Sequence, residues 1–163
     1  MIKSICFVGK SNCGKTTLIT KVISKLSERG YKIGTVKHHN HDTHFDQEGK
    51  DTYKHYMSGA KQVIISSPGG YGMFIKVEKE LPLEEIIKMH EGMDLVIVEG
   101  YKREGINKIE IIRKERSSER ICSDDEVQAV ISDIEIETSR PYFNINDIDG
   151  VVKFIEERYL INK

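Results

Sequence analysis

The chain has 163 residues, of which 38% are hydrophobic and 31% charged, and this length is enough for one domain with a proper core. Its formal net charge is −1 with both signs interspersed, which argues against nucleic acid as a partner. No apolar run is long enough for a membrane span, and no signal-peptide region is visible. The three cysteines Cys6, Cys13 and Cys122 lack metal-ligand spacing, so we expect a reduced, cytoplasmic chain with no membrane partner.

The first predicted strand covers residues 2–8 and leads into a glycine-rich loop. The loop reads Gly9-Lys10-Ser11-Asn12-Cys13-Gly14-Lys15-Thr16 and fits the phosphate-binding P-loop pattern G-x-x-x-x-G-K-[ST]. Apolar residues then recur at helical spacing, which predicts a helix over 15–28 that stops at Gly30. Strand, glycine loop and helix in this order are the context that a nucleotide-phosphate site requires.

The residue types of the loop fit this chemistry. Gly9 and Gly14 let the backbone approach an anion closely, so that loop N–H groups and the positive end of the helix face the phosphate oxygens. We expect Lys15 to reach the β- and γ-phosphates and the Thr16 hydroxyl to bind Mg²⁺, with Thr17 near the α-phosphate. A plain glycine turn would explain Gly14 but not the Lys-Thr pair at the helix start.

A second predicted strand over 31–38 completes a βαβ unit and implies a parallel sheet. The polar segment 38–55 that follows lies at the edge where open α/β sheets bind ligands. It has three interpretations: a solvated loop before a helix toward Met57, a transition-metal site, or a nucleotide-responsive loop with Asp42 or Asp46 near Mg²⁺. The metal interpretation uses His38, His39, His41 and His44. We favour the third interpretation because packing does not explain so polar a segment there.

Two further strands, over 62–67 and 71–77, are joined by a short turn that favours an antiparallel pair at the edge of the sheet. A helix is expected after Pro82. Residues 94–99 then predict a strand buried on both faces, which ends in Glu99 before Gly100. A carboxylate in this position of a P-loop protein holds Mg²⁺ or its waters, so we expect Glu99 to bind Mg²⁺ directly, to bind it through water, or to act on the attacking water.

The last third of the chain predicts strands over 108–113, 127–133 and 142–145, with a charged loop over 114–120. A final helix is expected to be capped by Asn146 or Asp147. Asp133, at a strand end, is a candidate to accept hydrogen bonds from guanine N1 and N2, which adenine cannot offer. Together these elements predict an α/β P-loop NTPase fold, a mostly parallel twisted sheet flanked by helices with an antiparallel edge hairpin, as a single domain over 1–163.

The chain resembles the MobB family, molybdopterin-guanine dinucleotide biosynthesis protein B, over nearly its full length. Besides the P-loop, the resemblance rests on residues 35–38 with His41-Asp42, on 46–52, 58–60, 95–102, 129–133 and 145–147. The pairing of Lys-His-x-x-His-Asp with Gly-Lys-Asp-Thr is its most specific part. Cys13 and Tyr101 are mild departures, since the family commonly has a smaller residue and a Phe there.

The resemblance implies a GTP-binding protein with weak GTPase activity and Mg²⁺ as cofactor. It also implies a homodimer that helps to attach GMP to molybdopterin beside a MobA-type nucleotidyltransferase. The positions that match the family's second and third motifs are Lys37, His38, His41, Asp42, Asp46, Gly49, Lys50, Asp51, Glu99, Gly100 and Lys102.

From these positions we expect Lys15 and the loop amides to hold the triphosphate, and Thr16, Glu99 and Asp42 to position Mg²⁺. The candidates for contacting an anionic pterin phosphate or a partner are His38, His41, Lys50 and Lys102. Lys10 resembles the signature lysine of dimeric ParA/MinD-type ATPases, which suggests a contact across subunits.

Two other functions stay open from the sequence. A small-molecule kinase would use a strand-end carboxylate as base and Arg113, Arg116 and Arg120 as a lid, although no acceptor-binding motif is visible. A nucleotide-gated interaction module would bind the nucleotide without useful catalysis.

Overall fold

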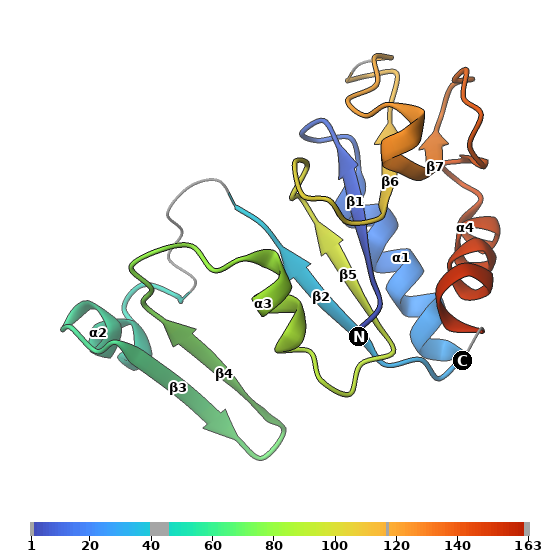
Figure 1. The fold of residues 1–163 in the computed structure, drawn as a ribbon. Helices are drawn as coiled ribbons and strands as arrows, with labels where there is room; N and C mark the ends of the chain where they lie inside the picture. The colour runs from blue at the N-terminus through green and yellow to red at the C-terminus, as the bar shows by residue number, and fades with distance from the viewer. Residues whose placement is uncertain (1, 40–45, 117, 162–163) are drawn as a thin grey trace. The chain divides into compact units, whose positions relative to one another are not determined.

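The computed structural model describes residues 2–39, 46–116 and 118–161. The chain divides into two compact units (Figure 1), one formed by residues 1–38 with 83–163 and the other by residues 39–82. The expectation of a single domain over 1–163 stays a prediction.

The first unit is built on a six-stranded sheet with the order β2-β5-β1-β6-β7-β8. All five neighbouring pairs are parallel, as the sequence predicts. The strands are β1 (Ser4–Gly9), β2 (Ile33–Lys37), β5 (Leu95–Glu99), β6 (Lys108–Ile112), β7 (Val127–Ser132) and β8 (Tyr142–Asn144). The carboxyl ends of these strands meet at one edge, which brings residues distant in the sequence together.

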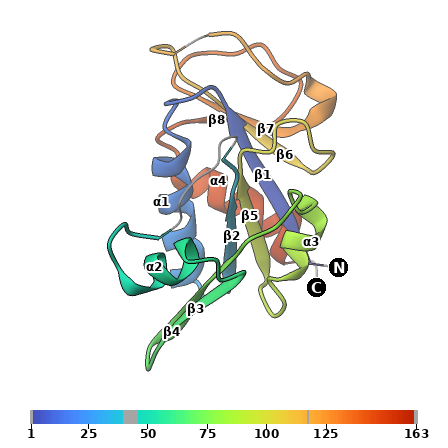
Figure 2. The ribbon, with the colours of Figure 1, turned by 90° about the vertical axis from the view of Figure 1, so that its left-hand side faces the viewer.

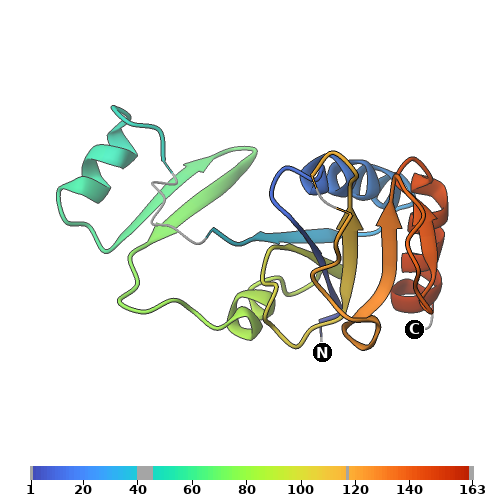
Figure 3. The ribbon, with the colours of Figure 1, turned by 90° about the horizontal axis from the view of Figure 1, so that it is seen from above.

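Helices cover both faces of this sheet (Figure 3). The helices α1 (Lys15–Glu28) and α4 (Ile148–Ile155), with the π-helical turn η2 (Glu156–Leu160), pack on one face, and α3 (Leu83–Lys88) packs on the other. Successive side chains of β1 alternate between the two faces. Ile5 and Phe7 therefore join the core under α1 and α4, whereas Cys6 and Val8 join the core under α3.

Local signals in the sequence set the helix ends. Gly30 has φ 88° after the last turn of α1, a left-handed conformation that favours glycine. The carboxylate of Asp147 accepts a hydrogen bond from the Gly150 N–H at 2.9 Å and caps the start of α4, as predicted. A short 3₁₀ turn, η1 (Asp124–Glu126), precedes β7. In the part of the chain that the structure describes, no helix is both long and apolar enough to cross a membrane.

The second unit consists of α2 (Asp51–Met57) and an antiparallel hairpin of β3 (Gln62–Ser67) and β4 (Gly70–Ile75) (Figure 2). The hairpin is confirmed, but it forms a two-stranded sheet of its own, whereas we expected it at the edge of the large sheet. The short turn between the strands determines their antiparallel pairing. Nothing in that turn determines which other strand lies beside them, and this explains the difference.

Candidate functional site

The glycine-rich loop joins β1 to α1 at the carboxyl edge of the sheet. Asn12 at φ 60° and Gly14 at φ 81° have left-handed backbones, which turn the chain sharply before the helix. A Cβ on Gly9 would lie 2.5 Å from the Ile111 carbonyl oxygen and 2.8 Å from the Cys13 sulfur. Glycine is therefore required where the loop packs against β6. The loop leads directly into the first turn of α1, where the backbone N–H groups of a helix have no intrahelical partner and can bind an anion.

Lys15 folds back over the mouth of this loop. Its ammonium donates hydrogen bonds to the carbonyls of Gly9 at 3.2 Å and Lys10 at 2.8 Å. The Cys13 thiol beneath it is buried, 3.7 Å from the Lys15 nitrogen. Ser11 and Thr17, which we predicted to assist in phosphate binding, are exposed. A point charge placed here, beside the N-terminal end of α1, can hold a polyphosphate.

Thr16 and Glu99 lie together beside the loop. The Thr16 hydroxyl is 3.1 Å from each carboxylate oxygen of Glu99, and the Lys37 ammonium is 3.6 Å from Oε1. The Glu99 side chain is only 15% exposed. A hydroxyl and a carboxylate are oxygen donors of the kind that Mg²⁺ prefers, so these two side chains fit such an ion. The third residue predicted for this role, Asp42, lies outside the described residues, as does His41.

The ends of β2 and β5 fit tightly behind Glu99. The His38 N–H donates to the Glu99 carbonyl at 2.9 Å, and the His38 and Tyr101 rings lie 4.3 Å apart. Gly100 has φ 109°, and a Cβ there would be 2.9 Å from the His38 Cβ. Tyr101 has φ 36°, an uncommon conformation for a residue with a side chain. Such strain costs about 1–3 kcal/mol and occurs most often at functional sites.

On the other side of the loop, Arg113 and Asp133 follow the ends of β6 and β7. Asp133 Oδ1 accepts from the Lys114 N–H at 2.9 Å, and Oδ2 is 3.7 Å from Arg113 Nε. Arg113 Nη1 lies 3.3 Å from the position that a Cβ on Gly14 would occupy. From the sequence we predicted Asp133 as a candidate, but considered Arg113 only as part of a kinase lid.

The remaining predicted residues make other contacts or lie in the second unit. Lys10 pairs with Glu119 of the same chain at 3.1 Å. Lys102 is exposed in the turn after β5, and Lys50 precedes α2 in the second unit. Asp46 Oδ1 accepts from the Gln47 N–H at 2.8 Å. Within residues 2–39, 46–116 and 118–161, no three His, Cys, Asp or Glu side chains gather as metal ligands, and His41 and His44 lie outside these ranges.

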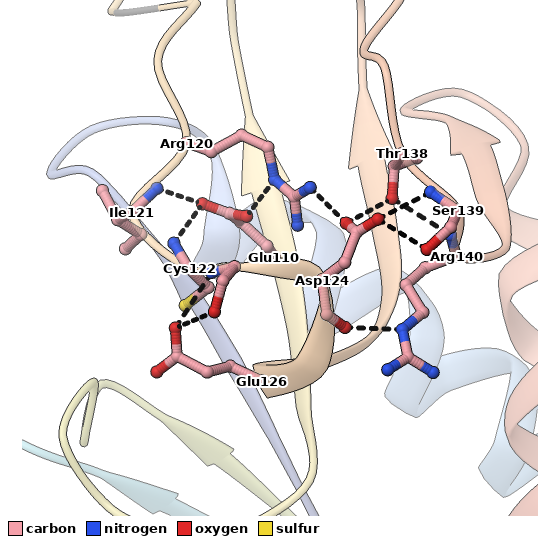
Figure 4. Close-up of polar contacts among 10 residues, drawn as sticks. Glu110, Arg120, Ile121, Cys122, Asp124, Glu126, Thr138, Ser139 and Arg140 are labelled. Atoms are coloured by element: carbon pink, nitrogen blue, oxygen red, sulfur yellow. Dashed lines mark hydrogen bonds and ion pairs between the residues drawn. The ribbon is translucent and has the colours of Figure 1, made fainter.

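A buried polar network supports the loop that carries Arg113 (Figure 4). Glu110 on β6 is 1% exposed, and it accepts from Arg120 Nε at 3.0 Å and from the backbone N–H groups of Ile121 and Cys122. Arg120 also pairs with Asp124, which anchors the return of the chain to β7. The sequence signal for this network is a carboxylate flanked by apolar residues within a strand, a signal that we did not use in predicting the site.

The sheet, the tight glycine loop and the Thr16–Glu99 pair define an α/β protein of the P-loop class. Residues 4–133 match the MobB family, described as Molybdopterin guanine dinucleotide synthesis protein B. The chain belongs to this family.

Known proteins are similar to this one in sequence and structure along nearly the whole chain. The Molybdopterin-guanine dinucleotide biosynthesis adapter protein of Escherichia coli (strain K12) is 35% identical, over 96% of this chain and 93% of its own. The protein of the same name from Haemophilus influenzae is 33% identical, over 91% and 84%. A crystal structure of molybdopterin-guanine biosynthesis protein B (mobB) has a TM-score of 0.76 at 28% identity, covering 96% of this chain and 98% of that one. The Bacillus subtilis MobB structure, at 24% identity and a TM-score of 0.72, shares the fold, over 94% of this chain and 98% of that one.

Proposed function

We propose that this protein binds GTP with Mg²⁺ and acts as an adapter in the biosynthesis of molybdopterin-guanine dinucleotide. The observation that carries the nucleotide part is the Thr16–Glu99 pair, 3.1 Å apart, beside the glycine loop. The adapter role is supported by membership of the MobB family and by the names of the relatives.

In this proposal each side chain has a defined task. Lys15 and the loop N–H groups hold the triphosphate, and Thr16 with Glu99 holds Mg²⁺, which neutralises phosphate charge when bound. Asp42 is proposed as a third group near the ion. Glu99 already accepts from Thr16 and faces Lys37, so it serves the metal side of the site and is not committed to orienting water. Hydrolysis is therefore slow unless a partner completes the site.

The partner proposals follow from the same family role. A MobA-type nucleotidyltransferase would attach GMP to molybdopterin, and His38, His41, Lys50 and Lys102 are the candidates to contact the anionic pterin phosphate or that enzyme. We also propose a homodimer. The hairpin supports it, because one of its faces exposes the apolar side chains of Ile64, Tyr71, Met73 and Ile75.

Calorimetric titration with GTP and with ATP, each with and without Mg²⁺, tests the nucleotide proposal. We expect a clear preference for GTP, weaker GTP binding in Asp133→Ala, and a Mg²⁺-dependent gain that disappears in Thr16→Ala. Circular dichroism of both variants verifies that the fold survives. Equal binding of the two nucleotides, or preference for ATP, would favour a kinase or an ATP-gated module instead.

A further inference from the structure

Arg113 and Asp133 place a positive and a negative group side by side next to the P-loop. The guanidinium comes from the end of β6 and the carboxylate from the end of β7, with 3.7 Å between Arg113 Nε and Asp133 Oδ2. The side chains are 39% and 28% exposed, so both can be reached by a ligand. This is the edge where parallel α/β sheets bind ligands, on the side of the loop away from Glu99.

A guanidinium can only donate hydrogen bonds, and an ionised carboxylate can only accept them. Guanine presents the matching order, since its O6 acceptor lies next to its N1–H donor. Adenine presents the reverse order, an amino donor at position 6 next to an acceptor at N1. With adenine, the guanidinium would face an amino donor and the carboxylate would face an acceptor, so polar groups would be left unpaired. A mismatch of this kind discriminates between similar ligands more strongly than an apolar pocket does.

The surroundings hold this pair in place. The Lys114 N–H donates a hydrogen bond to Asp133 Oδ1 at 2.9 Å. Because Gly14 has no Cβ, there is space beside it for Arg113 Nη1. Arg113 Nε is buried and has no hydrogen-bond partner among the described residues, since 3.7 Å to Asp133 is too long for such a bond. The buried Glu110–Arg120 contact anchors the far end of the Arg113 loop. A site of this kind depends on such support.

We propose that Arg113 is a specificity residue that donates to guanine O6 while Asp133 accepts from N1–H. This inference rests on the proposed GTP binding, and it identifies Arg113 as the group that recognises guanine O6. The same guanidinium beside Gly14 has one competing role, a contact with the nucleotide phosphates. The two roles differ in what they do to ATP, because a phosphate contact serves both nucleotides equally.

The test measures the affinities of GTP, ATP and 6-thio-GTP by calorimetry in Mg²⁺, for the wild-type chain and for Arg113→Met. Methionine keeps an apolar stem over Gly14 but removes the donors. In 6-thio-GTP, sulfur replaces O6 and accepts hydrogen bonds only weakly, whereas N1–H is retained. Arg158→Met is the control for the loss of one positive charge. Arg158 lies near the C-terminal end of the chain and contacts Gln128, so it is not part of the Arg113–Asp133 pair.

We expect the wild type to bind GTP more tightly than 6-thio-GTP, and Arg113→Met to bind GTP roughly tenfold more weakly with ATP unchanged. The difference between GTP and 6-thio-GTP should then disappear in the variant, as in a double-mutant cycle. Equal loss for all three nucleotides would assign Arg113 to the phosphates and overturn the inference. Equal wild-type binding of GTP and 6-thio-GTP would also overturn it, without any variant, and would leave GTP binding itself intact. A wild type that binds no GTP would overturn the proposed function as well.

Discussion

At the scale of single residues, Glu99 carries the negative charge next to the P-loop threonine. Its carboxylate touches the Thr16 hydroxyl and faces the Lys37 ammonium. Replacing the carboxylate by an amide keeps its size and an acceptor for Thr16, but removes the charge that a divalent cation requires. The metal contribution of Glu99 can therefore be separated from its structural one.

We predict that Glu99→Gln reduces the gain in GTP affinity on adding Mg²⁺ by about tenfold, in line with the loss of a charged contact. Binding measured in EDTA should stay the same or improve, because the triphosphate no longer meets a negative neighbour. Calorimetry with and without Mg²⁺ gives both values. If the variant keeps the full Mg²⁺ gain, Glu99 is not a metal ligand in this protein.

The contacts of Asp124 favour the charged form of its carboxyl group. The ion pair with Arg120, together with hydrogen bonds from Ser139 and Thr138, holds the pKa of this carboxyl well below its ordinary value of 3.8. A carboxyl with a pKa lower in the folded than in the unfolded state stabilises the fold above the unfolded value. That stabilisation is lost as the pH falls through 3.8 toward the folded pKa.

We therefore predict that the stability difference between the wild type and Asp124→Asn is largest near neutral pH and shrinks as the pH falls below about 4. Urea unfolding, followed at a series of pH values, measures it. Asp149→Asn provides a comparison, since its contact with Lys25 lowers the pKa of Asp149 at an exposed site. If this stability difference is the same at neutral pH and at about pH 3, the charge of Asp124 does not stabilise the fold.

At the scale of elements, β6 carries a buried charge in the middle of the sheet. Glu110 is 1% exposed and depends on Arg120, whose side chain is 20% exposed. Removing one partner of such a pair leaves the other charge buried without compensation, whereas replacing both by apolar residues of similar volume is often tolerated. The network in Figure 4 therefore predicts strong coupling between the two positions.

We predict that Arg120→Met lowers the free energy of unfolding by about 3 kcal/mol, and that adding Glu110→Leu recovers part of this loss. Urea denaturation of the wild type, the two single variants and the double variant gives the coupling energy. Additive losses in the double variant would show that the pair contributes only through packing.

The elements also show which parts of this protein the sequence reveals. The strands, the helices and the glycine loop follow from local patterns: alternation, helical spacing and the Gly-Lys-Thr sequence at a helix start. The meeting of Thr16 with Glu99 was predictable too, because the carboxyl ends of parallel strands share one edge. The Arg113–Asp133 contact was not, although both residues end predicted strands, because the sequence does not tell which strands are neighbours in the sheet. Strand pairing beyond a tight turn is equally non-local, and this is why the hairpin was expected at the edge of the large sheet.

At the scale of the whole molecule, the second unit consists of a two-stranded hairpin and one short helix, α2. An isolated two-stranded sheet is marginal in water, and it needs further strands or packing partners. In β3 and β4, Ile64 pairs with Met73, and Tyr71 and Ile75 lie on the same face of the hairpin. All four side chains are exposed, Tyr71 by as much as 78%. A second copy of the chain offers the same apolar face, and a two-fold axis would bury both at once.

We predict that Met73→Glu converts the proposed homodimer into monomers, because a charge at the centre of that face would be buried without a partner. Thr20→Glu adds the same charge on the exposed surface of α1 and should leave the dimer intact. Analytical ultracentrifugation of both variants over a range of concentrations measures the dissociation constant, and circular dichroism verifies the fold. If Met73→Glu associates as tightly as the wild type, the dimer uses another surface. If the wild type itself sediments as a monomer, the proposed homodimer is wrong.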